Sequence, residues 1–295
     1  MIAMHPDVVM VPMETHIYRL VYEPFIALPN RDLRQRLRSW KGILRRYGLK
    51  PLLFGIQPCH IWRGILQNHQ ILQRENAYGL HGLVRYSELK SLMKAVRTQP
   101  ANDLTQAEDL IAALFDCFFQ HQGGTENQTL LEKTPMHIRY VDRILRRFSD
   151  AKVIEAIRDG RDVCVSYNAL AQQQRWARLG TQRAIQQWKQ CIQWGEKYRA
   201  QAEFKARIHS VRYESLKANS QEGLREIFDF AGLACNQPKL DEIIQATDIS
   251  QIHEKGEGHY VRKGAIGEWK TRLTEDERAI CQNIAGEQLK QLGYD

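Results

Sequence analysis

The sequence lacks the patterns that mark several large classes of protein. None of its six cysteines forms a Cys-x-x-Cys pair, so we expect neither a zinc site nor a disulfide scaffold. No apolar run approaches the ~18 residues of a membrane-spanning helix. The first residues show neither the basic start nor the apolar stretch of a signal peptide. These absences favour a protein of the reducing cytoplasm without a transmembrane segment.

The charge is moderately positive. The chain has 295 residues, with 42 Lys and Arg against 34 Asp and Glu, which gives a net charge of +8. No nucleic-acid reader motif accompanies this excess, so we do not expect nucleic acid as a partner, although a basic surface for a polyanion stays an alternative. With 43% hydrophobic residues the chain can bury a substantial core.

The order of expected elements indicates the fold class. Helical spacing of apolar residues predicts helices at 31–47, 106–121, 181–203 and 221–232. Runs rich in β-branched residues predict strands at 151–157 and 208–213. The four prolines of residues 1–30 predict a loop with short helical turns. Strands separated by helices indicate βαβ units, so we expect one α/β domain with a parallel sheet over residues 1–295.

The segment Arg158–Ser166 follows the first predicted strand and leads into a helix. In open α/β sheets, ligands bind beyond the carboxyl ends of the strands. An arginine at the strand end and a serine two helical turns later could both bind one phosphate, because guanidinium and hydroxyl groups donate hydrogen bonds to it. Alternatively, Arg158 and Arg161 pair with Asp159 and Asp162, and the spacing alone leaves both interpretations open.

A second basic segment, Tyr260–Gly264, is followed by Gly267–Lys270. Two adjacent cations before a glycine can surround an anion, since glycine lets the backbone approach closely. A basic loop that is simply solvated is the alternative.

Two further segments carry groups suited to catalysis. In Glu132–Pro135, Lys133 could neutralise charge on a leaving group, and the same residues could begin a helix with Thr134 as its cap and Pro135 at its first position. In Pro12–His16, Glu14 could act as a general base if it reaches the proton to be removed. A purely structural glutamate is the alternative there.

Taken in order, these segments resemble a known family. The resemblance is carried by His5–Val8 with Glu14–His16, then Glu132–Pro135, Arg158–Ser166, Val211–Leu216, and Arg262–Gly264 with Gly267–Lys270. They are similar to the sulfotransferases that use 3′-phosphoadenosine 5′-phosphosulfate (PAPS), and they span nearly the whole chain. The resemblance implies a P-loop-type parallel sheet flanked by helices, with a largely helical substrate cap at 17–130.

The resemblance also implies which residues bind the donor. Its 3′-phosphate would be held by Arg158, Ser166, Arg262, Lys263 and Gly264. Tyr213 would contact the adenine, with Tyr260 and Thr247 as further candidates beside the ring.

The implied catalytic groups are Lys133 and Glu14. Lys133 would face the bridging oxygen or the transferring sulfuryl group. The cytosolic small-molecule enzymes place a histidine base two residues after that lysine, where this chain has Pro135. The tyrosylprotein and heparan-type enzymes use a glutamate shortly after a His-Pro-Asp segment, so Glu14 is the expected base, with His16 and His137 as weaker candidates.

The implied reaction is in-line sulfuryl transfer to a hydroxyl or amine of a small molecule, lipid, sugar or peptide, with no metal required. The alternative is a catalytically inactive relative that binds 3′-phosphoadenosine nucleotides as an interaction module.

One family feature is absent from these residues. Members carry a strand and a phosphate-binding loop of the type Pro-Arg-Ser-Gly-Thr-Thr before the His-Pro-Asp segment, and no Gly-x-x-x-x-Gly-Lys-[Ser/Thr] occurs elsewhere. We expect the complete protein to carry roughly twenty more residues upstream of Met1, enough for a strand and its loop. A decayed or repurposed relative is the alternative, which would bind PAPS weakly and be poorly soluble.

Overall fold

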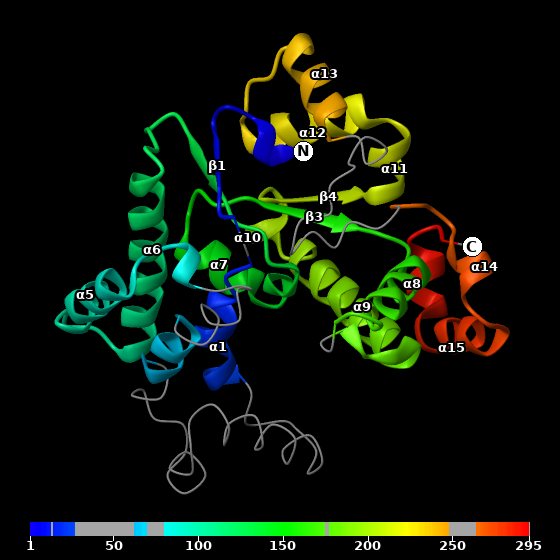
Figure 1. Ribbon diagram of the computed structural model, residues 1–295, viewed down its shortest axis with the longest axis horizontal. Coiled ribbons are helices and arrows are strands. Elements are labelled where there is room, and N and C mark those ends of the chain that lie inside the picture. Colours follow the sequence, from blue (N-terminus) through cyan, green and yellow to red (C-terminus); the bar gives the residue numbers. More distant parts are fainter. Residues whose placement is uncertain (13, 27–61, 70–79, 175–176, 248–263, 295) are drawn as a thin grey trace, which may run out of the picture. The chain divides into compact units, whose positions relative to one another are not determined.

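The structure, a computed structural model, describes residues 1–12, 14–26, 62–69, 80–174, 177–247 and 264–294 (Figure 1). The chain divides into two units: unit 1 is Met1–His5 with Val141–Asp295, and unit 2 is Pro6–Tyr140. The single domain over 1–295 and the substrate cap at 17–130 stay predictions. The helix expected at 31–47 lies outside the described residues. Within those residues, no helix has the length and apolar character needed to cross a membrane.

Unit 2 combines a small parallel sheet with helices. Its elements are β1 (Val8–Met10), α1 (Ile17–Ile26), η2 (Leu80–Gly82), α5 (Tyr86–Arg97), α6 (Asp103–His121), β2 (Thr129–Leu131) and η3 (Pro135–Tyr140). Residues 62–69 are also helical. β1 pairs in parallel with β2, with Val8 opposite Thr129 and Met10 opposite Leu131. The helix predicted at 106–121 is confirmed as α6, which begins earlier because the Asn102 side chain caps it by accepting from Thr105 N.

The prediction of a loop with short turns over residues 1–30 is wrong in two places. Residues 8–10 form β1, because β2 supplies their hydrogen-bond partners. Residues 17–26 form α1, in which Ile17, Leu20 and Val21 are buried on one side. Tertiary burial of this apolar face outweighs the proline signal, which falls in the last turn of the helix at Pro24.

Unit 1 contains the other parallel pair. Its elements are η1 (Ile2–Met4), α7 (Val141–Arg147), β3 (Val153–Ile157), α8 (Gly160–Leu170), α9 (Gly180–Arg199), α10 (Ala202–Lys205), β4 (Ile208–Arg212), α11 (Tyr213–Ala218), α12 (Ser220–Ala231), α13 (Gln237–Ala246), α14 (Trp269–Arg272) and α15 (Glu275–Gln291). β3 pairs in parallel with β4, with Val153 opposite Ile208 and Ile157 opposite Arg212. Both strand predictions and the α/β fold class are therefore confirmed.

Two of the expected helix ends can be compared with the structure. The helix expected to run to residue 203 ends at Arg199, and a separate short helix, α10, follows. The helix expected to end on a glycine does so: α12 ends at Ala231, and Gly232 adopts the left-handed conformation with φ 81°. Glycine suits this position because a Cβ atom disfavours positive φ.

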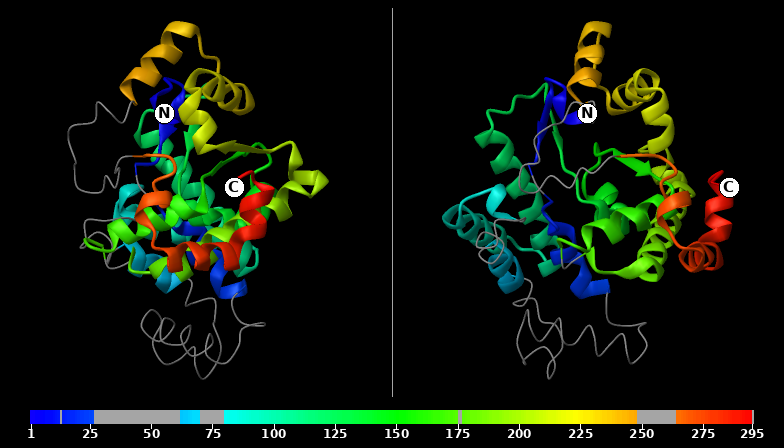
Figure 2. Two further views of the ribbon diagram at one scale, coloured as in Figure 1. Left: turned by 90° about the vertical axis from the view of Figure 1, so that its right-hand side faces the viewer. Right: turned by 45° about the vertical axis from the view of Figure 1, so that its right-hand side comes forward.

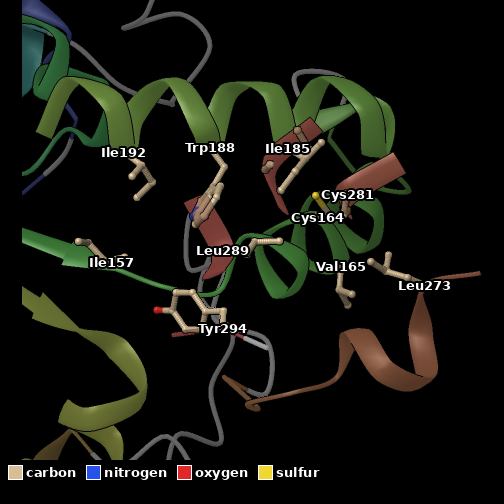
Figure 3. Packing of buried hydrophobic residues seen from close by; sticks show 12 residues of the cluster. Ile157, Cys164, Val165, Ile185, Trp188, Ile192, Leu273, Cys281, Leu289 and Tyr294 are labelled. Carbon is tan, nitrogen blue, oxygen red and sulfur yellow. The ribbon is translucent and has the colours of Figure 1, made fainter. Parts of the chain in front are cut away.

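Helices α8, α9 and α15 pack together in unit 1 (Figures 1 and 2). The buried cluster between them includes Ile157 from β3, Cys164 from α8, Trp188 from α9, and Leu289 and Tyr294 from the C-terminal region (Figure 3). This packing fixes the position of α8 against the end of β3. The first turn of α8 therefore has a rigid support.

Candidate functional site

The backbone at the carboxyl end of β3 is held from two sides. Arg158 follows β3 directly, and Asp159 is the N-cap of α8. The indole Nε1 of Trp188 donates to the Arg158 carbonyl oxygen at 2.9 Å. The Asp159 N–H donates to the Glu214 carboxylate at 2.9 Å. These bonds satisfy backbone groups that the strand and helix leave open, and they fix where the Arg158 side chain begins.

The Arg158 side chain meets the segment at 264–265, although the two are about a hundred residues apart in sequence. Arg158 Nη2 donates to the Ala265 carbonyl oxygen at 2.7 Å, and the guanidinium carbon lies 4.8 Å from the centre of the Tyr213 ring. The Tyr213 hydroxyl donates to the Gly264 carbonyl oxygen at 2.7 Å, and Lys217 Nζ donates to the same oxygen at 2.6 Å. Figure 1 shows this segment, in orange, passing the carboxyl end of β3. Three predicted donor-binding residues, Arg158, Tyr213 and Gly264, thus lie together.

Asp162 anchors the continuation of this segment to α8. Its carboxylate accepts hydrogen bonds from Gly267 N at 2.7 Å and from Trp269 N at 2.9 Å, and the side chain is 1% exposed. Gly267 has φ 76°, a conformation that favours glycine. Ser166 is four residues after Asp162 on α8 and is half-buried. Because residues at i and i+4 share a helix face, Ser166 lies on the side of α8 that carries the anchored segment.

The ion-pair interpretation of the four charged residues holds at short range for one pair and only at long range for the other. Arg161 binds Asp159 at 2.8 Å, and its guanidinium carbon lies 3.7 Å from the centre of the Trp269 ring. In contrast, Arg158 is 4.0 Å from Asp162, whose oxygens already accept the two backbone N–H groups. Arg158 Nε is buried and has no hydrogen-bond partner among the described residues. A buried N–H group without an acceptor costs free energy, and an anion at this point would satisfy it.

The two predicted catalytic residues lie together in unit 2. Lys133 Nζ forms an ion pair with Glu14 Oε1 at 2.8 Å. The other carboxylate oxygen of Glu14 is 3.8 Å from His16 Nε2. Burial lowers the pKa of His16, although the nearby Glu14 carboxylate opposes this shift. The neutral form of His16 is therefore favoured.

Glu132 is a partly buried carboxylate to which sequence reasoning assigned no role. It accepts hydrogen bonds from Thr15 Oγ1 at 3.0 Å, from Thr134 Oγ1 at 2.6 Å and from His137 Nδ1 at 2.9 Å. Burial by itself raises the pKa of Glu132, but these hydrogen bonds, led by that from His137, outweigh burial and lower it. Thr15 adjoins Glu14, so this network holds the backbone beside both members of the Lys133–Glu14 pair.

The structure also bears on the helix-start interpretation of residues 132–135. Pro135 does begin a helical segment, η3, as expected. Thr134, expected to cap that segment, donates its hydroxyl to Glu132, and its carbonyl oxygen accepts from His137 N at 2.9 Å. The signal available in the sequence was the set of hydroxyl and imidazole donors within five residues of a carboxylate.

Two further predicted residues, Thr247 and His137, lie within the described part of the chain. The Thr247 hydroxyl donates to the Ile243 carbonyl oxygen of its own helix at 2.7 Å, so its place beside the adenine stays a prediction. His137, a weaker candidate for the base, is buried with Nδ1 bound to Glu132. Tyr260, Arg262 and Lys263 lie outside the described residues.

Comparisons with known proteins found similar solved structures and a matching family model. The chain is similar to the mouse sulfotransferase SULT7A1, solved in complex with PAP, with 15% identity and a TM-score of 0.45 over 59% of this chain and 69% of that one. It is also similar to the sulfotransferase domain from the curacin biosynthetic pathway, with 21% identity and a TM-score of 0.42 over 70% of this chain and 78% of that one. A third similar structure is the sulfotransferase domain of the Synechococcus PCC 7002 olefin synthase, with 19% identity and a TM-score of 0.42 over 75% of this chain and 80% of that one.

No curated protein matches the chain. The model of the sulfotransferase family, however, matches residues 58–237, which is more than half of the 295 residues. This match includes Lys133, Arg158, Ser166 and Tyr213. The chain belongs to the sulfotransferase family.

Proposed function

We propose that this chain transfers a sulfuryl group from PAPS to a hydroxyl or amine of an acceptor. Family membership supports sulfuryl transfer in general. The observation that supports the donor is the contact of the Arg158 guanidinium and the Tyr213 ring with the segment at 264–265. Two regions far apart in sequence supply cationic and aromatic groups at one place, which suits a nucleotide that carries a phosphate on its ribose.

In this proposal the 3′-phosphate binds at the first turn of α8. Arg158 Nε, which has no partner among the described residues, donates to a phosphate oxygen. Ser166 adds a hydroxyl from the same helix, and the backbone at Gly264 approaches the anion closely. Tyr213 contacts the adenine, with its ring held by the hydrogen bond to the Gly264 carbonyl oxygen. Arg262 and Lys263 are proposed to complete the anion site, and Thr247 and Tyr260 to lie beside the adenine.

Glu14 is the proposed general base and Lys133 the proposed cation at the leaving group. Glu14 takes the proton of the acceptor hydroxyl or amine as that atom forms a bond to sulfur. The bond between sulfur and the bridging oxygen breaks at the same time, and the departing 3′-phosphoadenosine 5′-phosphate (PAP) takes its electron pair. As with phosphoryl transfer, the protein contributes mainly by positioning and by stabilising charge.

The Lys133–Glu14 ion pair links these two events. While Glu14 is ionised, it holds the Lys133 ammonium at 2.8 Å. When Glu14 accepts the proton it loses its negative charge, so its attraction for Lys133 weakens. The ammonium is then free to neutralise the charge that develops on the leaving oxygen.

Transfer of radiolabelled sulfate from PAPS tests the function. The acceptors are 4-nitrophenol, glucosamine, a long-chain alcohol and a tyrosine-containing peptide. We expect Glu14→Gln to abolish transfer and to leave the dissociation constant of PAP unchanged, since glutamine cannot accept the proton. Glu126→Gln, at an exposed glutamate of the same unit, should keep full activity. Transfer that survives Glu14→Gln contradicts the base assignment, and tight PAP binding without transfer to any acceptor supports an inactive nucleotide-binding module.

A further inference from the structure

Three potential metal ligands meet where α5 packs on α6 in unit 2 (Figure 1). Glu88 is on α5, and Cys117 and His121 are one turn apart on α6. One ligand atom from each of these residues lies within 4.8 Å of the other two. Because i and i+4 residues share a helix face, α6 presents the thiol and the imidazole side by side towards the α5 carboxylate.

Two of the three distances between these atoms suit tetrahedral coordination of one metal ion, and the third, from Cys117 to Glu88, is within 4.8 Å. Cys117 Sγ is 3.8 Å from His121 Nε2, and His121 Nε2 is 3.5 Å from Glu88 Oε1. A zinc ion with ligand bonds of about 2.0–2.3 Å in tetrahedral geometry holds its ligand atoms roughly 3.3–3.8 Å apart. The residues therefore need only small side-chain movements to bind one ion.

We propose that Glu88, Cys117 and His121 form a Zn²⁺ site that joins α5 to α6. A thiolate, an imidazole and a carboxylate are the ligand types that zinc takes in proteins, whereas Mg²⁺ and Ca²⁺ take oxygen ligands. The thiol also argues for a borderline or soft transition metal. With three protein ligands, water fills the fourth position. This site shares no residue with the proposed transfer site.

The Arg85 guanidinium already donates a hydrogen bond to the Glu88 carboxylate. Arg85 Nη2 donates to Glu88 Oε1 at 2.6 Å, and the Arg85 backbone N donates to Glu88 Oε2 at 2.7 Å. The Arg85 side chain is 81% exposed, so it can move into solvent when a metal ion takes its place. The backbone bond to Oε2 belongs to the capping box of α5, and it keeps the carboxylate oriented.

Metal binding to the full-length chain, stripped with a chelator, tests this proposal. We expect one Co²⁺ per chain to produce a sulfur-to-cobalt charge-transfer band that one equivalent of Zn²⁺ removes. Cys117→Ser should abolish the band, and His121→Ala should weaken Zn²⁺ binding by at least about tenfold. Zn²⁺ should also raise the melting temperature of the wild type, because a ligand that binds only the folded state stabilises it.

Two control variants remove a thiol and a carboxylate that are not proposed ligands. Cys235→Ser removes a partly exposed thiol of unit 1, and Asp116→Asn removes an exposed carboxylate beside Cys117. Both should bind Zn²⁺ as the wild type does. His121 is exposed, so its alanine variant should melt as the wild type does in chelator. The absence of a charge-transfer band in the wild type, or unchanged Zn²⁺ affinity in both ligand variants, would overturn the site.

Discussion

Arg158→Ala should weaken the binding of PAP selectively, because it removes the group that we assign to the 3′-phosphate. The guanidinium has one hydrogen bond to the segment at 264–265 and a buried Nε that has no partner among the described residues. A hydrogen bond to a charged group contributes about 1.5–3 kcal/mol. Loss of the bond from Nε alone therefore corresponds to roughly a 10- to 150-fold higher dissociation constant for PAP.

The assay is calorimetric titration with two nucleotides, PAP and AMP, of which only PAP has a 3′-phosphate. Arg158→Ala should raise the dissociation constant of PAP and leave that of AMP nearly unchanged. Arg158→Lys should lie between the wild type and alanine, since lysine keeps the charge but loses the planar fork and the contact with the Tyr213 ring.

The control variant is Arg225→Ala, which removes an exposed arginine of α12 in the same unit. It should bind both nucleotides as the wild type does. An equal loss of affinity for PAP and AMP in Arg158→Ala would show that Arg158 supports the surrounding structure and not the 3′-phosphate. Unchanged PAP affinity would refute the assignment altogether.

Two further predictions concern stability. Gly160→Ala places a Cβ atom 2.6 Å from the Trp188 ring, so urea unfolding should show a free energy of unfolding lower by about 1–3 kcal/mol. In the control Gly286→Ala, the new Cβ meets only the flexible end of Gln282, so the free energy of unfolding should not fall. The lowered pKa of Glu132 means that its contribution to stability is present above pH 4.5 and is lost as the pH falls through that lowered value. Glu132→Gln should therefore lower the free energy of unfolding by about 1–3 kcal/mol at neutral pH. It should also make the melting temperature fall less steeply as the pH is lowered, and an unchanged dependence of melting temperature on pH would contradict this.

Elements with strong local signals could be predicted. β3 and β4 are short β-branched runs, and α6 has Leu110, Leu114 and Phe118 on one buried face. Residues 8–10 and 17–26 could not be predicted, because β1 exists through pairing with β2 and α1 through burial of its apolar side. Periodicity reports a local pattern, whereas these elements depend on partners distant in sequence.

The same division applies to the candidate site. Residue type and spacing indicated Arg158 and Lys133 as candidates, and the family resemblance added Tyr213. They could not show that Arg161, three residues after Arg158, is bound to Asp159 and Trp269, while Arg158 Nε has no hydrogen-bond partner in the part of the chain that the structure describes. For Glu132 they offered the two nearby donors, Thr134 and His137, but not the third donor, Thr15, which is 117 residues away.

The amino-acid sequence by itself determined the α/β class, the order of the segments and the chemical groups available for sulfuryl transfer. Only the tertiary structure decided which of those groups lie close together in space. Hydrogen-bond partners such as Arg158 with Ala265, or Lys133 with Glu14, are separated by 107 and 119 residues. Their proximity arises from how β3, α8 and the other elements pack, since local spacing sets the direction of a side chain but not its distant neighbours.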